Sequence, residues 1–499
     1  MKRSAGILLP LFCLPSPYGI GCMDKAAYDF VDFLASAGQK YWQILPLSAT
    51  GHGGSDDSPY QSISAFAGNP YFISLSDLVE EGVLSAEECE DALGNLPYDK
   101  TDYDALHEKR LSLLRKAYER SNISGNPDFL DFVWDNAWWL DDYATFAAVR
   151  SFFGETAFSQ WPEDIRKHWG FALDHYRREL YFDIEFHKYL QFQFFRQWKK
   201  LKDYANKKGI SIIGDVPIYV SPDSADVWAH PELFRVDSNG KPTDVAGCPP
   251  DAFAEEGQMW GNPLYRWEQH RNTDYGWWRS RVYMAFRLYD VVRLDHFRGF
   301  DEYYVIPAGS ENALNGHWEK GPNMELFCCI RHHLGDKQFI AEDLGFVTDS
   351  VRQLVQDSGF PNMKVLQFAF DVGDTYGKNP YLPHHHGENS VVYTGTHDND
   401  TLLGWLESMD TEQVARLEEY FRRKGTEELH KAVMDAAMGS AANLCIIPLQ
   451  DHLQLDGSHR VNQPGTVGKN WRWRVNKNLL TAERAEEILH LTCRFGRGE

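Results

Sequence analysis

Short apolar runs that end in polar residues recur along the chain, and each has the length of a buried β-strand. The runs cover residues 5–9, 41–45, 211–216, 291–295, 339–342, 365–370, 391–396 and 444–449. Helical patterns lie between most of them. Residues 24–37 place five apolar side chains on one helix face, and further helices are predicted at 350–356, 411–422 and 427–437. The chain is therefore predicted to alternate eight buried strands with helices.

Eight parallel strands that alternate with helices form a (β/α)8 TIM barrel of the α/β class. About 165 residues separate the second and third strands, too many for one crossover. We expect a mostly helical insertion at 72–207, whose last helix, near 182–207, leads into the third strand. A second, loop-rich insertion is expected at 221–280. Both follow strand ends where barrels place active sites, so residues 1–499 are predicted to form one catalytic barrel with inserted subdomains around its C-terminal face.

Composition narrows the class of protein. The 499 residues carry 50 Lys and Arg against 72 Asp and Glu, a net charge of −22, with 43% hydrophobic residues. This is the balance of a globular protein. The acidic excess argues against a nucleic-acid-binding surface and against an anionic membrane surface as partner. Aromatic residues reach 14%, with 16 Trp, which suits sugar-stacking surfaces as well as a large aromatic core.

The eight cysteines form no CxxC pair. They are interpreted as free thiols in a reducing compartment, and a cytoplasmic location is predicted. The basic Lys2 and Arg3 precede an apolar run at 6–14 that is similar to a signal peptide. Pro10 breaks this run and no small-residue cleavage motif follows it. A buried first strand is therefore favoured.

Acidic residues end five of the predicted strands: Asp215, Asp295, Glu342, Asp398 and Asp451. One such Asp would be explained by helix capping. Strand ends in a barrel converge on one axis, so five acids together predict a cleft lined by carboxylates.

Two of these acids have contrasting surroundings. Arg293 lies two residues before Asp295, on the same side of a strand, and is expected to lower the pKa of Asp295, as a carboxylate nucleophile requires. Glu342 follows the apolar residues 339–341, and burial is expected to raise its pKa, as a general acid requires. An ionised Asp beside a protonated Glu is typical of a retaining glycosidase. A structural ion pair and a solvated Glu are the alternatives.

Sequence motifs add a family resemblance. The run 293–296 (RLDH), the strand end at Glu342 and the pair His397-Asp398 resemble the α-amylase superfamily. Longer stretches resemble the 4-α-glucanotransferase family (amylomaltases, or disproportionating enzymes) within it. They lie at 58–62 (SPYQS), 65–70 (AFAGNP), 214–218 (GDVPI), 223–228 (DSADVW), 249–251 (PPD), 257–265 (GQMWGNPLY), 462–466 (NQPGT) and 470–474 (NWRWR).

The resemblance implies a role for each matching residue. Asp295 matches the nucleophile, Glu342 the acid/base and Asp398 the third carboxylate. Arg293 and His397 match groups that orient the donor sugar. The substrate contacts implied are Asp215, Tyr60, Gln258, Trp260 and Asn462, and residues 249–262 match a loop that arches over the family's cleft. The expected substrates are α-1,4-glucans and maltooligosaccharides, with neither cofactor nor metal.

Three rival functions remain at this point. An α-1,4-glucan hydrolase shares the same carboxylates, and their spacing does not choose between transfer and hydrolysis. A barrel with Asp215, Asp295 and Glu342 at its mouth is also compatible with Mg²⁺, as in enolase-like enzymes, although Arg293 would compete with the metal. A non-catalytic glucan-binding protein is expected to lack one of the three catalytic acids, and this chain keeps them all.

Overall fold

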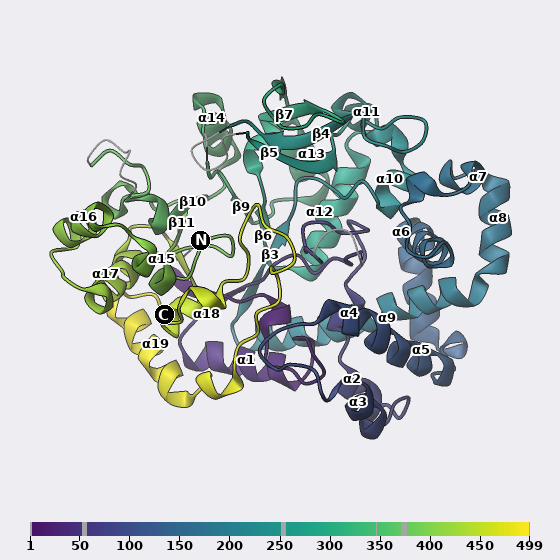
Figure 1. Ribbon diagram of the computed structural model, residues 1–499, viewed down its shortest axis with the longest axis horizontal. Coiled ribbons are helices and arrows are strands. Elements are labelled where there is room, and N and C mark those ends of the chain that lie inside the picture. Colours follow the sequence, from purple (N-terminus) through teal and green to yellow (C-terminus); the bar gives the residue numbers. More distant parts are fainter. Residues whose placement is uncertain (1, 52–56, 251–255, 346, 371–376, 499) are drawn as a thin grey trace.

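The computed structural model describes residues 2–51, 57–250, 256–345, 347–370 and 377–498. Its centre is a closed barrel of eight parallel strands, in the order β1-β12-β11-β10-β9-β6-β3-β2 (Figure 1). The predicted (β/α)8 architecture is confirmed. The barrel strands are β1 (Ser4–Leu8), β2 (Tyr41–Gln43), β3 (Ser211–Val216), β6 (Val291–Leu294), β9 (Phe339–Ala341), β10 (Asn362–Val365), β11 (Ser390–Tyr393) and β12 (Leu444–Pro448).

Helices surround the barrel and fill the long connections. Helix α1 shows why they form: the side chain of Asp24 accepts the Ala26 N–H and caps the helix, and the five predicted apolar positions are all buried. The helices are α1 (Lys25–Ser36), α2 (Leu75–Glu80), α3 (Ala86–Leu93), α4 (Tyr103–Ala105), α5 (Leu111–Arg120), α6 (Pro127–Phe152), α7 (Glu163–Arg166), α8 (Gly170–Glu179), α9 (Tyr181–Lys207), α10 (Ala225–Ala229), α11 (Trp267–Asn272), α12 (Gly276–Leu288), α13 (Asn323–Leu334), α14 (Asp349–Ser358), α15 (Leu402–Ser408), α16 (Thr411–Phe421), α17 (Thr426–Gly439), α18 (Leu449–His452) and α19 (Ala482–Arg494).

The sixth predicted strand is shifted along the chain. Strand β10 covers Asn362–Val365, and residues 366–368 of the apolar run at 365–370 form a 3₁₀ turn instead. The strand alternates half-buried Asn362 and Lys364 with buried Met363 and Val365. This alternation is not a continuous apolar run, so the predicted strand starts at residue 365, where β10 ends.

The connection between β2 and β3 contains helices α2 to α9, which occupy the right-hand half of Figure 1. Residues 221–280 contain two strands that the sequence analysis did not predict, β4 (Asp244–Cys248) and β5 (Gln258–Pro263). They join β7 (Glu302–Pro307) and β8 (His317–Lys320) in an antiparallel sheet of order β5-β4-β7-β8, at the top of Figure 1. This sheet matters for function because β5 carries residues of the cleft.

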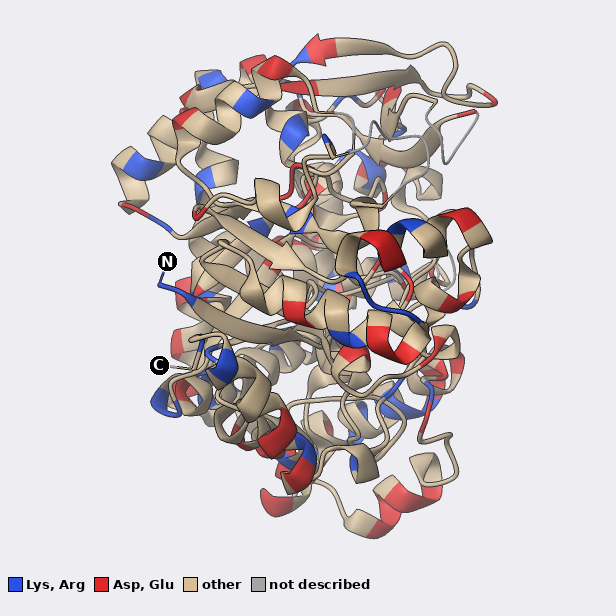
Figure 2. Cartoon of the chain, turned by 90° about the vertical axis from the view of Figure 1, so that its left-hand side faces the viewer, with Lys and Arg blue, Asp and Glu red and all other residues tan. Residues whose placement is uncertain are grey.

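The surface shows the mixed charge expected from the composition. On the side of the molecule in Figure 2, basic and acidic residues are interspersed on the outer helices, and the two chain ends lie near each other. All eight cysteines are free thiols. Among the described residues, no helix is both long enough and apolar enough to cross a membrane.

Candidate functional site

A cleft of about 580 Å³ opens at the C-terminal ends of the barrel strands. Loops that follow β2, β3, β6, β9, β11 and β12 line it, together with strand β5. Of the ten residues predicted for the site, eight line this cleft: Tyr60, Gln258, Trp260, Asp295, Glu342, His397, Asp398 and Asn462. The other two, Arg293 and Asp215, are buried beneath its floor.

Arg293 is the cation that organises the floor. Its Nη1 donates to Asp215 Oδ2 at 2.6 Å and to Asp295 Oδ1 at 2.9 Å, and Nη2 lies 3.9 Å from Glu342 Oε2. Strand register explains the first pair, because Asp215 on β3 lies opposite Arg293 on β6. The Arg293 side chain is only 4% exposed, so water screens these interactions weakly.

Two of the three carboxyl groups around Arg293 hold protons more tightly than usual. Burial, together with the charges of Asp215 and Asp398, raises the pKa of Asp295 to about 7, although Arg293 opposes the rise. Burial and the charge of Asp295 raise the pKa of Glu342 to about 8. The direction predicted for Glu342 is confirmed. The direction predicted for Asp295 is wrong, because burial of its carboxyl raises the pKa by more than Arg293 lowers it.

Glu342 is held by the backbone beside Asp295. Its Oε2 accepts the His296 N–H at 2.6 Å, and its Oε1 accepts the Leu344 N–H at 2.9 Å. His296 adopts a left-handed φ of 51°, unusual for a residue with a side chain. Its ring packs edge-on against Trp260, with centroids 4.8 Å apart. The sequence analysis gave His296 no role, although its position next to Asp295 was a signal.

A line of hydrogen bonds joins the floor of the cleft to the third acid. The Tyr60 hydroxyl lies 2.8 Å from Asp215 Oδ2 and 2.9 Å from His397 Nε2. His397 Nε2 also lies 3.3 Å from Asp398 Oδ2. Because Tyr60 gives its single proton to a carboxylate, its oxygen accepts from His397, which therefore carries the proton on Nε2. Asn462 Nδ2 donates to Asp398 Oδ1 at 2.6 Å.

Aromatic and amide groups form the remaining walls. Trp260 Nε1 donates to Gln258 Oε1 at 3.2 Å, both on β5. Gln61, which received no role from the sequence, donates to Asn262 Oδ1 at 3.2 Å and ties the β2 loop to β5. Trp471 lies against Tyr60, with ring centroids 5.9 Å apart. Residues 251–255 of the loop expected to arch over the cleft lie outside the described residues.

The acids of the cleft do not form a cation site among the described residues. Arg293 already occupies the space between Asp215, Asp295 and Glu342 that a magnesium ion would need. The described residues contain one cluster with the spacing of metal ligands, away from the cleft lining: Asp274, Cys329 and His333.

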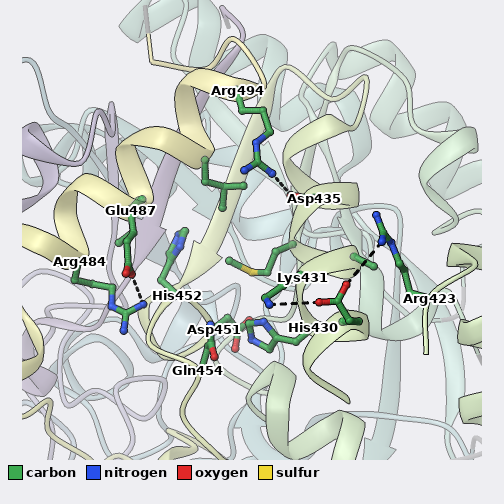
Figure 3. A pocket seen from close by; sticks show the side chains of 15 residues that line it. Arg423, His430, Lys431, Asp435, Asp451, His452, Gln454, Arg484, Glu487 and Arg494 are labelled. Carbon is green, nitrogen blue, oxygen red and sulfur yellow. Dashed lines mark hydrogen bonds and ion pairs between the residues drawn. The ribbon is translucent and has the colours of Figure 1, made fainter. Parts of the chain in front are cut away.

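A second cavity, of about 400 Å³, lies between α17 and α19 (Figure 3). It contains Asp451, the fifth acid predicted at a strand end. That prediction is wrong for the cleft, because Asp451 accepts the Thr394 hydroxyl at 2.6 Å and the Leu402 N–H at 2.8 Å. Asp451 thus fastens the start of α15 to the barrel.

Comparisons with known proteins agree on one family. The model of the 4-alpha-glucanotransferase family matches residues 9–481. The 4-alpha-glucanotransferase of Clostridium butyricum is 45% identical over 97% of this chain and 99% of its own length, and that of Thermus thermophilus is 43% identical over 98% of both. The structure of amylomaltase from Streptococcus agalactiae in complex with acarbose superposes with a TM-score of 0.96 at 40% identity, covering 100% of both chains.

Proposed function

Because this chain belongs to the 4-alpha-glucanotransferase family, we propose that its cleft transfers α-1,4-glucan segments through a covalent glucosyl-enzyme, with retention at the anomeric carbon. The chain is an enzyme, a glycosyltransferase of the amylomaltase type. The hydrolase alternative has less support, since relatives 43–46% identical over nearly the whole chain are named 4-alpha-glucanotransferases. The observation that carries the proposal is the unequal sharing of Arg293 between Asp295 and Glu342.

Asp295 is the nucleophile in this proposal. It lies 2.9 Å from Arg293, against 3.9 Å for Glu342, so when the pair loses its first proton the charge is best stabilised on Asp295. Glu342 keeps its proton and delivers it to the glycosidic oxygen. The bond from the anomeric carbon to that oxygen breaks as Asp295 forms an ester with the carbon. The leaving glucan departs with the proton of Glu342.

The second displacement reverses these roles. Esterified Asp295 carries no charge, so the pKa of Glu342 falls and its carboxylate becomes a base. It removes the proton from the 4-hydroxyl of an acceptor glucan, whose oxygen attacks the anomeric carbon and displaces Asp295. Two inversions restore the α configuration. With water in place of the acceptor, the same step would be hydrolysis.

Asp398 holds the donor sugar in this scheme. Asn462 contacts one of its oxygens and His397 the other, which leaves the remaining lone pairs for sugar hydroxyls. Burial lowers the pKa of His397, so its ring stays neutral at neutral pH and its Nε2–H supports Asp398 without neutralising it. Arg293 and Asp215 act as positioning residues from beneath the floor.

The walls select the acceptor. Trp260 offers a half-buried ring for pyranose stacking, while Gln258 and Tyr60 offer hydrogen-bonding groups at the same opening. A bound glucan excludes water from this space and thereby favours transfer. We further propose a cytoplasmic enzyme of glycogen, starch or maltooligosaccharide metabolism, which the free thiols support.

The test is incubation with maltotriose in the presence of EDTA. We expect a ladder of longer maltooligosaccharides together with shorter products, while the total of reducing ends stays constant. Glucose and maltose alone, with rising reducing ends, would replace transfer with hydrolysis. Loss of all activity on chelation would point to a metal-dependent barrel.

A further inference from the structure

Three side chains that commonly bind metals meet where the turn between α11 and α12 contacts α13. Asp274 belongs to the turn, and Cys329 and His333 belong to α13. Cys329 Sγ lies 3.4 Å from Asp274 Oδ1, and His333 Nε2 lies 2.8 Å from Asp274 Oδ2. One ligand atom from each residue lies within 4.8 Å of the other two. A thiol, an imidazole and a carboxylate thus converge at a place outside the lining of the catalytic cleft.

One face of α13 presents the site. Glu325, Cys329 and His333 follow one another at intervals of four residues, so they form a stripe along the helix. Arg271, in the last turn of α11, donates to the two carboxylate oxygens of Glu325 at 2.8 and 3.0 Å. This ion pair holds the chain against the same stripe three residues before Asp274. The ligands therefore come from two elements that already lie together, and a metal does not have to assemble them.

The backbone of the turn is fixed on both sides of the carboxylate. Asp274 and Tyr275 both have left-handed φ angles, of 51° and 50°, and Tyr275 is buried. The Asp274 N–H donates to the Arg271 carbonyl at 2.9 Å, and the Tyr275 N–H donates to the His270 carbonyl at 2.7 Å. These bonds hold the peptide groups of a sharp turn, so the Asp274 side chain is presented to α13 by an ordered backbone.

The spacing of the three ligand atoms suits a tetrahedral Zn²⁺ ion. Zinc lies about 2.3 Å from a Cys sulfur and about 2.0–2.2 Å from a His nitrogen or carboxylate oxygen, so its tetrahedral ligand atoms are about 3.3–3.6 Å apart. The 3.4 Å between Cys329 Sγ and Asp274 Oδ1 lies in this range. The hydrogen bond between His333 and Asp274 has to lengthen by about half an ångström to admit the ion. A thiolate and an imidazole favour Zn²⁺ over Mg²⁺ and Ca²⁺, which prefer oxygen ligands.

Exposure and charge are both compatible with the ion. The side chains of His333 and Asp274 are 34% and 62% exposed, so a metal can enter from solvent and a water molecule can be its fourth ligand. Cys329 loses its thiol proton to solvent when the sulfur binds, and the thiolate and the carboxylate then balance the two charges of Zn²⁺. Arg279 is a competing cation, but its Nη1 lies 3.6 Å from Asp274 Oδ2, beyond hydrogen-bonding distance. The ion therefore replaces an ion pair there, not a hydrogen bond.

We propose that Asp274, Cys329 and His333 bind one Zn²⁺ ion, which fastens the turn between α11 and α12 to α13. Helix α12 leads into β6, which carries Arg293, and α13 leads into β9, which Glu342 follows. The ion thus links the two helices that precede these strands and stabilises the folded chain. Its ligands do not line the cleft, so the reaction there proceeds with or without zinc, and the inference does not depend on the proposed function.

Adjacent residues provide matched controls for the experiment. Cys328 and His332 are exposed, lie one position before each helical ligand and are outside the cluster. The full chain, freed of metal with a chelator, is titrated with Co²⁺, whose bond to a thiolate produces a charge-transfer absorption, and Zn²⁺ is then added as competitor. We expect one Co²⁺ per chain, displaced by Zn²⁺. Cys329→Ser should lose the absorption and His333→Ala should bind at least about tenfold more weakly, whereas Cys328→Ser and His332→Ala should behave as the wild type.

Thermal unfolding gives a second measurement. Zn²⁺ should raise the Tm of the wild type and of both control variants in proportion to the logarithm of its concentration, and should leave the Tm of Cys329→Ser unchanged. Circular dichroism without metal shows whether each variant is folded, and Asp274→Asn replaces Cys329→Ser if that variant is not. A wild type without the thiolate absorption would overturn the inference. Equal binding by the wild type and the three ligand variants would also overturn it, because the ion would then be adventitious.

Discussion

The catalytic cleft and the cavity between α17 and α19 contain similar residue types but divide their charges differently. In the cleft, one buried cation, Arg293, serves Asp215, Asp295 and Glu342. In the cavity the cations are matched by acids. Arg423 lies 3.8 Å from Glu428, Arg494 3.4 Å from Asp435 and Arg484 2.5 Å from Glu487 (Figure 3). Lys431 lies 2.7 Å from Glu427.

The difference shows how a charge cluster becomes reactive. Exposed, matched pairs are screened by water, and the carboxyl in the cavity wall with a pKa raised to about 7 is that of Asp451, which is buried. A buried cluster with more acids than cations holds protons near neutral pH, so a carboxyl can act as an acid. Three acids around the single buried cation Arg293 are therefore the feature that supports catalysis.

The largest effect is expected from Asp295→Asn. The amide cannot form the ester, so kcat should fall roughly 10⁴-fold or more, while glucan binding stays measurable by calorimetry. Asp435→Asn in the cavity is the same chemical change at a matched pair and should leave kcat unaltered. Activity of Asp295→Asn within tenfold of the wild type would remove it as nucleophile.

Glu342→Gln tests the acid of the cleft. Loss of the proton donor should lower kcat on maltotriose by about 10²–10⁴-fold. Because fluoride leaves with little help from an acid, formation of the glucosyl-enzyme from a maltosyl fluoride donor should be far less affected. Glu487→Gln is the control from the cavity. Equal losses with both donors would argue that Glu342 has a structural role.

The dependence of kcat/KM on pH measures the pKa values of the two carboxyl groups beside Arg293. Activity requires ionised Asp295 and protonated Glu342, with pKa values raised to about 7 and about 8. Activity should therefore rise as pH approaches 7 and fall above 8, a narrow bell for the free enzyme. A rise in activity near pH 4 instead would show that Arg293 stabilises the ionised form of Asp295 more strongly than burial destabilises it.

Tyr60→Phe weakens the support of the cluster without removing a charge. Asp215 then loses a hydrogen-bond donor and interacts more strongly with Arg293, so Arg293 stabilises ionised Asp295 less. The acid limb of the pH profile should therefore move to higher pH. We expect about a tenfold loss of kcat, the cost of one buried hydrogen bond. A uniform loss with an unchanged pH profile would instead indicate substrate contact alone.

The sequence predicted the barrel well because buried parallel strands appear as continuous apolar runs. The prediction failed at β10, where Asn362 and Lys364 alternate with the buried positions. It also failed at β4 and β5, which belong to the separate antiparallel sheet and have few buried apolar residues in a row. The acids at the strand ends could be predicted as well, because they directly follow the continuous apolar runs. The pKa of Asp295 could not be predicted, since spacing reveals Arg293 beside it but not how strongly the carboxyl is buried, and burial is the larger effect.

The smallest effect is expected in the cavity. Arg494 and Asp435 are 63% and 44% exposed, so water and salt screen their attraction and two long side chains lose freedom to form it. Arg494→Gln should change the free energy of unfolding by no more than about 0.5 kcal/mol, without changing kcat or its pH dependence. Urea denaturation at low and high salt measures the free energy of unfolding, and maltotriose transfer at several pH values measures kcat and its pH dependence. A clear change in the pH profile would mean that the cavity communicates with the cleft, because Asp451 in the cavity wall bonds to Thr394, three residues before His397.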